Sequence, residues 1–378
     1  MKMKILMINY SEIKSPGGVH KTIRELAKNL SENGHNVTVV QGNLMNLKNQ
    51  EIINQYKIIR VQSKYAKYFY GLSPEITGYV CKNLTNISPD IIHVHGYHTL
   101  LSAEIIFTIK KKIKSNIPII FSPHYCSDSH STIAGKYLWN FYNNVVGTKA
   151  FDLVDHIVCA SEYERKELMR DIKLPSSKIS IIPHGVNRLN FNKCRDLKSN
   201  YINLLYVGNL LYLKGVQHIL NVVNVIKFMF NKDVILNIVG HGEYQQELLK
   251  LAERLNILDS IKWYHSLFGE QLYQKYREAD IFLLLSSSEN YGIVIAEALA
   301  SGTPCIVSNT TALKEFIKEP GCFGVNFPPD PKKIAQLILK IYDSQIKVGP
   351  FSNKISTWDE VTKDYEILYK KSLRRRKI

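Results

Sequence analysis

The chain has 378 residues, 45% of them hydrophobic and 22% charged, which excludes an intrinsically disordered protein and favours a globular one of two domains. Its apolar runs are short, as at residues 281–285, so no membrane-spanning helix is expected. The net charge of +16 is uneven: residues 1–200 hold 27 basic and 15 acidic side chains, whereas residues 201–350 hold 14 of each. This asymmetry predicts an anionic partner for the first half or, equally, a solvated lysine-rich surface.

The first half of the chain alternates short apolar runs with helical patterns. It opens on MKMKILMINY, which indicates a strand and not a signal peptide. Because the runs are continuously apolar, they predict strands of a parallel sheet that is covered on both faces. The strands are expected at residues 4–10, 36–40, 90–96, 118–124, 156–161 and 179–185. A helix is expected at 19–34, where a glycine closes it.

The same alternation restarts after the polar segment 187–200. Strands are expected at residues 202–208, 234–240, 260–266, 280–287, 304–308 and 324–327. Two such arrays predict an α/β fold of two doubly wound, Rossmann-like domains. An amphipathic helix at 356–378 has the positive charge of the first half, so we expect it to pack back on the first domain. The predicted domains are residues 1–190 plus 356–378, and residues 191–355.

The six cysteines are scattered and include no C-x-x-C pair. They predict free thiols in a reducing compartment.

Two carboxylates, Glu289 and Glu297, lie eight positions apart in SSSENYGIVIAEALASGTPCIVS, residues 286–308. Glu289 follows a predicted buried strand, and Glu297 lies early in a helix that is expected from near Gly292 to Ser301. Ligands of open α/β sheets bind beyond the carboxyl ends of strands, which is where this junction lies.

The junction offers two kinds of ligand contact. The backbone amides of Tyr291, Gly292 and Ile293 are expected to begin the helix without acceptors, which suits a diphosphate. Carboxylates beside such amides suit the hydroxyl groups of sugars. For one glutamate alone, a favourable interaction with the helix dipole is the better interpretation. The whole pattern predicts a nucleotide sugar as the ligand.

The segment from Glu289 to Glu297 resembles the E-x7-E motif of the retaining glycosyltransferases of family 4, also called glycosyl transferases group 1. Other family motifs occur in the expected order, as PGGV (16–19), IPHGVN (182–187), YVGNLLYLKG (206–215) and GHGE (240–243). The resemblance implies the GT-B fold, two Rossmann-like domains facing across a cleft, with the C-terminal helix on the first. It also implies transfer of a hexose-type sugar from a nucleotide-diphosphate sugar.

The resemblance assigns roles to individual side chains. Lys214 falls where the family places a lysine on the leaving diphosphate, Glu289 is expected to contact the transferred sugar, and Glu297 the ribose. His124 matches a family histidine beside the sugar. The predicted catalytic residues are His124, Lys214 and Glu289; the predicted substrate-binding residues are Gly17, Gly18, Asn209, Lys214, Glu289, Asn290, Tyr291, Gly292, Ile293 and Glu297.

Two positions depart from the family pattern. Asn209 stands where the family usually has an arginine, and His241 stands where it usually has an aspartate. Loss of a permanent cation weakens stabilisation of the leaving group unless another basic residue replaces it. The alternative function is therefore a catalytically impaired protein that binds nucleotide sugars or serves as a scaffold.

No metal and no cofactor is expected. The histidines of HVHGYH (93–98) have no cysteine or carboxylate to complete a metal site, and the chain contains no Asp-x-Asp motif.

The expected partners are a UDP-, GDP- or ADP-linked sugar and an acceptor glycan or lipid. The basic first domain, the C-terminal tail and the segment KYAKYFYG (64–71) predict contact with an anionic membrane surface, and hence a cytoplasmic protein peripheral to the inner face of the membrane. An acceptor-binding loop or an ordinary surface segment is an equally good interpretation of residues 64–71. The nucleotide base, the sugar and the acceptor are left open.

Two other classes of protein fit less well. A nicotinamide dehydrogenase needs a third glycine after Gly240-His-Gly242. A nucleic-acid-binding protein would show an RRM, zinc or helix-turn-helix signature, so no nucleic acid is expected.

Overall fold

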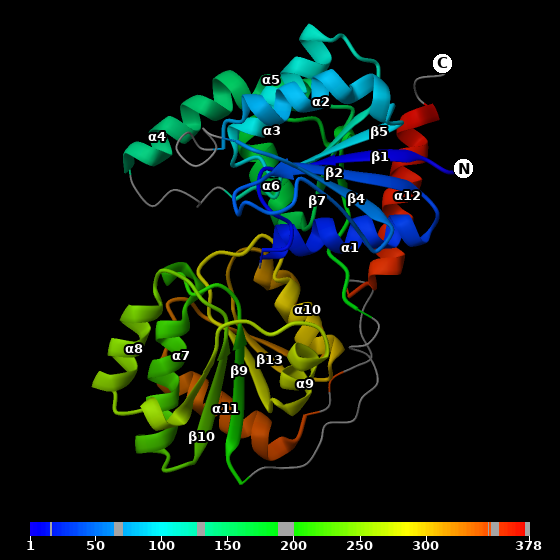
Figure 1. Cartoon of the computed structure of the whole chain (residues 1–378). Coiled ribbons are helices and arrows are strands. Elements are labelled where there is room, and N and C mark those ends of the chain that lie inside the picture. Colours follow the sequence, from blue (N-terminus) through cyan, green and yellow to red (C-terminus); the bar gives the residue numbers. More distant parts are fainter. Residues whose placement is uncertain are drawn as a thin grey trace. The chain divides into compact units, whose positions relative to one another are not determined.

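The computed structural model of the chain describes residues 1–15, 17–63, 71–126, 133–187, 200–346, 348 and 355–374 (Figure 1). The chain divides into two compact units. Unit 1 comprises Met1–Gly185 with Trp358–Ile378, and unit 2 comprises Val186–Thr357. Pro16, Cys194, residues 64–70 of the predicted membrane segment and the last four residues of the basic tail lie outside the described residues.

Unit 1 is built on an eight-stranded sheet with the order β3-β4-β2-β1-β5-β6-β7-β8 in the described part of the chain. Its strands are β1 (Lys4–Ile8), β2 (Asn36–Gly42), β3 (Gln50–Ile53), β4 (Tyr56–Val61), β5 (Ile91–His95), β6 (Ile119–Ser122), β7 (His156–Cys159) and β8 (Ile179–Ile181). Neighbouring strands run parallel except β3 and β4. All five residues of the central strand β5 are buried, as expected for a strand covered on both faces.

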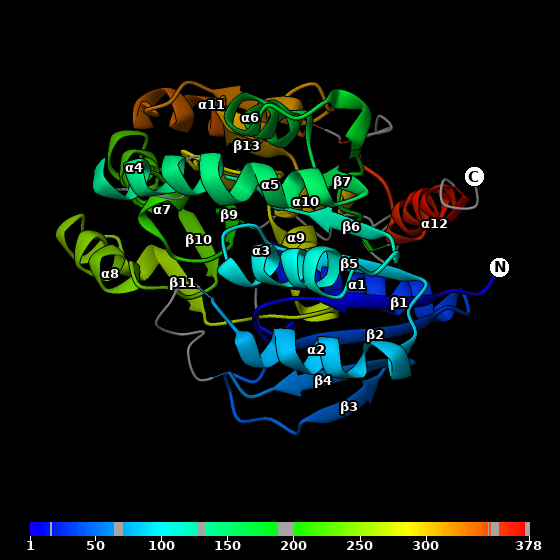
Figure 2. The same cartoon turned by 90° about the horizontal axis from the view of Figure 1, so that it is seen from above.

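Helices cover both faces of this sheet. They are α1 (Gly18–Glu32), α2 (Pro74–Ile87), α3 (Leu100–Phe107), α4 (Ile133–Tyr142), α5 (Thr148–Leu153), α6 (Glu162–Ile172) and α12 (Trp358–Arg374). Seen from above, α2, α3 and α5 lie in front of the sheet (Figure 2), while α1 lies on its opposite face (Figure 1). The right-handed crossovers of a doubly wound sheet require this division.

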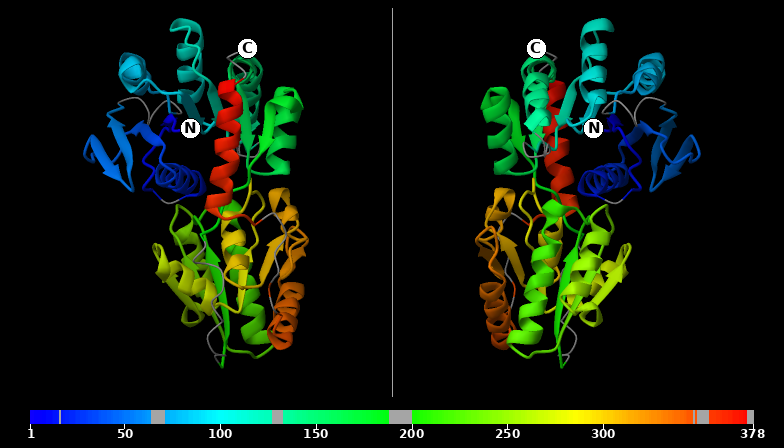
Figure 3. Two further views of the ribbon diagram at one scale, coloured as in Figure 1. Left: turned by 90° about the vertical axis from the view of Figure 1, so that its right-hand side faces the viewer. Right: turned by 90° about the vertical axis from the view of Figure 1, so that its left-hand side faces the viewer.

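The C-terminal helix α12 packs on unit 1, as predicted. Figure 3 shows it beside α1, and Asn33 at the end of α1 donates a hydrogen bond to Glu366 of α12 at 2.8 Å. Tyr369 of α12 reaches His93 of β5, with its hydroxyl 2.7 Å from Nδ1. The last helix therefore completes the core of the first unit.

The strands β3 and β4 were not predicted from the sequence. They form an antiparallel hairpin at the sheet edge, joined by Asn54 and Gln55, which both have positive φ (46° and 68°). Positive φ at both central residues is the geometry of a two-residue hairpin turn. Gln55 rarely adopts a positive φ, so the sequence gives no signal for this turn.

Unit 2 is built on a six-stranded parallel sheet with the order β11-β10-β9-β12-β13-β14 in the described part of the chain. Its strands are β9 (Ile202–Val207), β10 (Val234–Val239), β11 (Ile261–Tyr264), β12 (Ile281–Leu284), β13 (Cys305–Ser308) and β14 (Cys322–Val325). Its helices are α7 (Val216–Asn224), α8 (Gln245–Arg254), α9 (Glu270–Glu278), α10 (Ile293–Ala300) and α11 (Pro331–Ser344). Helices α7 and α8 lie on one side of the sheet and α9 and α10 on the other (Figure 1).

Each predicted strand of the second half corresponds to one of these strands. In the described part of the chain, no helix is both long enough and apolar enough to cross a membrane. The described cysteines are free thiols.

Candidate functional site

The candidate site of unit 2 lies at the carboxyl ends of β9 and β12. In the observed strand order the chain first winds outward from β9 through β10 and β11, and then returns to start again at β12. The connections on the β9 side and those on the β12 side cover opposite faces of the sheet. The place between β9 and β12, where the direction of winding reverses, is the switch point of the sheet, and ligands of open α/β sheets bind there. Lys214 follows β9 and Glu289 follows β12, so both predicted residues lie at this point.

Lys214 and Glu289 form an ion pair with each other. The Lys214 Nζ lies 2.7 Å from Glu289 Oε1, and the two side chains are 21% and 15% exposed. Both charged groups are thus held in one place and remain within reach of solvent. The resemblance assigns them to two parts of one substrate, and these roles stay predictions.

The loops after β9 and β12, which carry Lys214 and Glu289, are in direct contact with each other. The amide of Ser287 donates a hydrogen bond to the carbonyl of Leu213 at 2.9 Å. Gly215 has a φ of +75°, and a Cβ at this position would lie 1.9 Å from the carbonyl oxygen of Leu285. A glycine must therefore follow Lys214 if the two loops are to approach so closely.

Helix α10 begins directly beside the pair. Gly292 has a φ of +98° and precedes the helix, whose first internal hydrogen bond runs from the Ile295 amide to the Gly292 carbonyl at 2.9 Å. The amides of Ile293 and Val294 come before this bond, so they have no carbonyl one turn earlier to accept from them. The predicted helix start is thus close to the observed one, with Ile293 as the first helical residue.

The segment between β12 and α10 also contacts residues 311–316. The amide of Glu289 donates to the hydroxyl of Thr311 at 3.0 Å. Asn290 is partly exposed, whereas Tyr291 is buried and packs edge-on against Phe316, with ring centroids 5.3 Å apart. The predicted residues of this segment are therefore brought together at one strand-to-helix junction.

Glu297 lies in the second turn of α10 and is only 2% exposed. Its Oε2 accepts a hydrogen bond from the hydroxyl of the buried Tyr276 at 3.0 Å. The carboxylate predicted to bind ribose is thus oriented by an internal donor. Sequence reasoning missed Tyr276, because nothing in its local pattern on α9 distinguishes it from a core tyrosine.

Asn209 is exposed at the carboxyl end of β9, and its carbonyl accepts a hydrogen bond from the Tyr206 hydroxyl at 2.9 Å. Burial, and then the negative charge of Glu289, raise the pKa of Tyr206 well above its usual range. Tyr206 therefore stays a neutral donor near Glu289. The side chain of Asn209 offers no positive charge to replace the family's arginine.

In unit 1, Gly17 and Gly18 follow β1, which with β5 forms the switch point of the first sheet. Gly17 has a φ of +131° and caps α1, whose first residue is Gly18, and both glycines are exposed. This backbone conformation favours glycine. The structure thus places both residues where the resemblance expects a phosphate loop, and that role stays a prediction.

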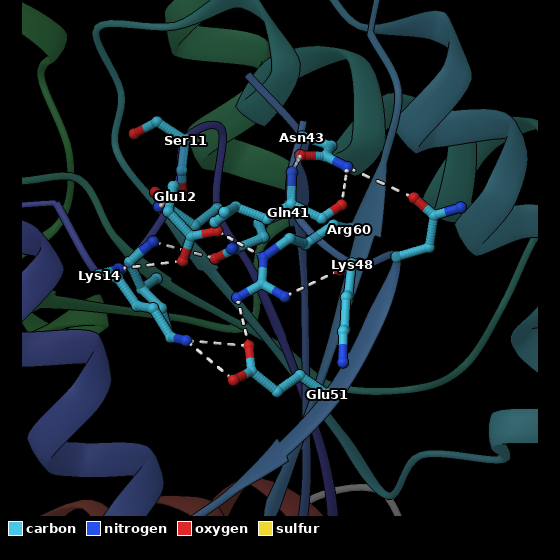
Figure 4. A network of polar contacts seen from close by, with 12 residues as sticks. Ser11, Glu12, Lys14, Gln41, Asn43, Lys48, Glu51 and Arg60 are labelled. Carbon is cyan, nitrogen blue, oxygen red and sulfur yellow. Dashed lines mark hydrogen bonds and ion pairs between the residues drawn. The ribbon is translucent and has the colours of Figure 1, made fainter. Parts of the chain in front are cut away.

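The loop that leads to these glycines is held by a buried polar network (Figure 4). Arg60 of β4 donates to Glu12 through Nε and, at 2.8 Å, to Glu51, which also accepts from Lys14 at 2.8 Å. Glu12 and Arg60 are 2% and 3% exposed. Burial alone would raise the pKa of Glu12, but hydrogen bonds from Arg60 and Gln41 outweigh it and lower that pKa, so Glu12 is ionised. Sequence reasoning did not identify this network.

His124 lies two residues beyond β6 and has a positive φ of 50°. Its Nε2 is 3.4 Å from Nδ1 of His95, and its ring centroid is 5.9 Å from that of His184. Burial, followed by the charges of neighbouring histidines, holds the pKa values of His95 and His124 well below their usual range. The predicted catalytic histidine is therefore a neutral imidazole within a cluster of histidines.

The histidines of HVHGYH each have protein partners. His93 contacts the Tyr369 hydroxyl through Nδ1 and, at 2.9 Å, the Ser122 hydroxyl through Nε2. Nε2 of His98 accepts from the amide of Cys126 at 3.0 Å. Among the residues that the structure describes, no three His, Cys, Asp or Glu side chains are grouped to hold a metal ion.

Solved structures with this architecture identify the fold. Sucrose-phosphate synthase from Thermosynechococcus elongatus superposes with a TM-score of 0.81 at 18% identity, over 98% of this chain and 99% of that chain. The Anabaena protein HepE, in complex with UDP-glucose, gives a TM-score of 0.68 at 15% identity over 99% of each chain. The fold is the GT-B fold of glycosyltransferases, as predicted.

Sequence comparisons identify the family. The family models "Glycosyltransferase Family 4" and "Glycosyl transferases group 1" match residues 16–188 and 190–357. This chain belongs to the family 4, group 1 glycosyltransferases, which confirms the predicted family and the prediction that the chain is a glycosyltransferase. The alpha-monoglucosyldiacylglycerol synthase of Streptococcus pneumoniae is 26% identical over 84% of this chain and 74% of that protein.

Proposed function

We propose that this glycosyltransferase moves a hexose-type sugar, with retention of anomeric configuration, from a nucleotide-diphosphate sugar to an acceptor glycan, lipid-linked acceptor or other glycoconjugate. The observation that carries the proposal is the Lys214–Glu289 pair at the switch point, next to the first amides of α10. A cation and helix amides suit a diphosphate, and a carboxylate suits sugar hydroxyls. The similar HepE structure, which contains UDP-glucose, supports this donor class.

In the proposed reaction, the bond between the anomeric carbon and the diphosphate oxygen breaks, and the acceptor oxygen bonds to the same face of that carbon. The proton of the acceptor hydroxyl passes to the departing phosphate. Lys214 and the first amides of α10 stabilise the charge that develops on the diphosphate, so the proposal requires no metal ion. Glu289 orients the sugar and is not assigned as a base. The roles of Gly17, Gly18 and His124 are predictions that the family resemblance carries.

A second candidate function rests on Asn209. With this neutral side chain in the family's arginine position, the protein would bind nucleotide sugars but transfer them poorly, and would serve as a binding or scaffold protein. Lys214 argues against this alternative, because it supplies a cation at the switch point.

Thermal unfolding with UDP, GDP and ADP tests donor binding. One nucleotide is expected to raise the melting temperature by several degrees at about 100 times its dissociation constant, because a ligand that binds only the folded state stabilises it. Glu297→Ala should reduce the shift, whereas Glu253→Ala on the exposed side of α8 is the matched control and should retain it. A shift without sugar transfer would favour the scaffold. No shift with any of the three would contradict both functions.

We further propose that the enzyme is cytoplasmic and peripheral to the inner face of the membrane, where it meets a lipid or a lipid-linked acceptor. The net charge of +16 supports attraction to anionic lipid. The name of the similar Streptococcus pneumoniae enzyme, which includes a diacylglycerol, supports a lipid acceptor. Fractionation of cells into cytosol and membranes, with and without high salt, tests the proposal: salt should release the protein from the membrane fraction.

A further inference from the structure

Helix α4 and the short π-helix that follows it, η3 (Asn143–Gly147), are anchored to unit 1 on one side. Trp139 and Tyr142 pack against Tyr97, with ring centroids 5.1 and 5.5 Å away. The buried Asn143 accepts from the Tyr97 hydroxyl at 2.7 Å and donates to that of Tyr125 at 3.2 Å. These contacts fix which side of the helix faces away from unit 1.

The outward side carries a row of exposed apolar side chains, which we call the α4 apolar row. Tyr137, Leu138, Phe141 and Val145 are 74%, 59%, 64% and 42% exposed. Residues three and four apart share one helical face, so 137, 141 and 145 follow one another along it and 138 lies beside them. In Figure 1, α4 projects from the edge of unit 1. A contiguous exposed apolar row of this kind marks an interaction surface.

The charge around the row favours an anionic partner. Residues 133–153, from the start of α4 to the end of α5, contain two lysines, at 136 and 149, and one acidic residue, Asp152. Two polar residues exposed beside the row, Asn140 and Asn144, are neutral. Phenylalanine, leucine and tyrosine on one side of a helix, in a segment whose sequence holds more lysines than carboxylates, suit the boundary between lipid headgroups and acyl chains.

We propose that the α4 apolar row docks unit 1 onto an anionic membrane surface. The aromatic and aliphatic side chains enter the headgroup region, while Trp139 and Tyr142 hold the helix on the protein. The proposal deepens the proposed function and rests on it only for the membrane as the place of the acceptor. It does not depend on which nucleotide sugar is the donor.

Vesicle co-sedimentation of the full chain tests the proposal. The protein is mixed with vesicles of phosphatidylcholine alone, or of phosphatidylcholine and phosphatidylglycerol in equal parts, and bound protein is measured after centrifugation. We expect binding to the anionic vesicles, and a loss of about tenfold or more in the double variant Leu138→Ser/Phe141→Ser, because both side chains lose their apolar contact with lipid. Both side chains are exposed in the structure, so the variant is expected to fold.

A matched control comes from unit 2, where Phe228 and Met229 are 54% and 57% exposed. Phe228→Ser/Met229→Ser removes similar apolar area from another helix and should bind vesicles as the unchanged protein does. Equal binding by the α4 variant and the unchanged protein would overturn the proposal, as would equal binding to the two kinds of vesicle. A dimer in ultracentrifugation that the α4 variant abolishes would also overturn it, and would assign the row to a second copy.

The nucleotide-induced thermal shift is measured in the same variants. A retained shift together with lost vesicle binding supports a membrane surface that is separate from the donor site. If the unchanged protein binds vesicles through the row but no nucleotide stabilises it, the proposed donor binding fails while the docking surface stands.

Discussion

Lys214 and Glu289 neutralise one another at the switch point of unit 2, although the proposed reaction needs them on different parts of one donor. A nucleoside diphosphate places negative charge close to Lys214 and therefore close to Glu289 as well. The carboxylate opposes binding of the diphosphate electrostatically, and supports catalysis only through the sugar. The two side chains should thus have separable effects.

Glu289→Gln is expected to tighten binding of the free nucleoside diphosphate about fivefold and to lower the rate of sugar transfer about 100-fold. The first effect follows because Lys214 loses its competing partner, and the second because a charged acceptor for the sugar hydroxyls is lost. Titration calorimetry and initial rates measure the two effects.

Two further variants serve as a comparison and a control for this prediction. Lys214→Ala should weaken diphosphate binding and transfer together, since it removes the cation itself. Glu253→Gln removes an exposed carboxylate from α8 and should change neither. Weaker diphosphate binding in Glu289→Gln would show that the carboxylate does not oppose the phosphates.

At the scale of elements, the Glu12–Arg60 pair joins the loop after β1 to strand β4 (Figure 4). Breaking a buried ion pair leaves an uncompensated charge in the protein interior, whereas removing both charges avoids that penalty. The pair therefore specifies the position of a loop more than it adds stability, and this loop leads to Gly17 and Gly18.

Arg60→Met is expected to lower the free energy of unfolding by about 3 kcal/mol, because Glu12 remains buried without its partner. Glu12→Gln/Arg60→Met should recover most of that loss. Urea unfolding measured by circular dichroism gives both values. Lys14→Met removes only an exposed partner of Glu51 and should change the free energy by about 0.5 kcal/mol or less. Equal losses in the single and double variants would mean that Glu12 does not need its partner.

The sequence predicts elements where the signal is local. The apolar run at 280–287 contains β12, and the glycine at 292 predicts the start of α10 to within one residue. The β3–β4 hairpin lacks such signals, since β3 has only four residues and its turn holds Asn54 and Gln55 instead of a glycine.

Parts of the site that depend on distant contacts are invisible in the sequence. Arg60 and Glu12 are 48 residues apart, and Tyr276 and Glu297 are 21 residues apart. A charged residue within a strand is predicted to be exposed unless its partner is known, because unpaired charges are rarely buried. The motif glycines and acids, by contrast, are placed by the strand order alone, because carboxyl ends of parallel strands meet at one edge of a sheet.

At the scale of the whole molecule, unit 1 buries histidines that cannot become charged without loss of stability. Burial lowers the pKa of His93 to about 3 and that of His184 to about 4, and those of His95 and His124 also lie well below the ordinary value. Below about pH 6.5 the unfolded chain binds protons at these positions while the folded chain does not. Their contribution to stability is therefore full above pH 6.5 and declines as the pH falls.

Carboxyl groups with raised pKa values act in the opposite direction. Burial raises the pKa of Glu164 to about 7, although hydrogen bonds from the amides of Ala160 and Tyr125 favour its charged form. The folded chain therefore binds a proton at Glu164 between about pH 7 and 4.5, where the unfolded chain does not, and this proton stabilises unit 1 as the pH falls. Burial also raises the pKa of Glu104, which is partly exposed. Four histidines outnumber these two carboxyl groups, so we expect unit 1 to lose stability on acidification.

As the pH falls from 6.5 to 5, each of the four histidines takes up a proton in the unfolded chain only. Each should therefore lower the free energy of unfolding of unit 1 by about 2 kcal/mol over this interval. Urea unfolding at several pH values measures the slope of the free energy of unfolding against pH. Variants of single residues show how much of this slope each residue causes. His93→Gln should reduce the slope by about 1.4 kcal/mol per pH unit, because one proton fewer is taken up on unfolding, and Glu164→Gln should steepen it by the same amount. The interval above pH 5 avoids the ordinary titration of exposed carboxylates. A slope that His93→Gln leaves unchanged would mean that this histidine is already protonated in the folded chain, against its two hydrogen bonds to neutral hydroxyl groups and its complete burial.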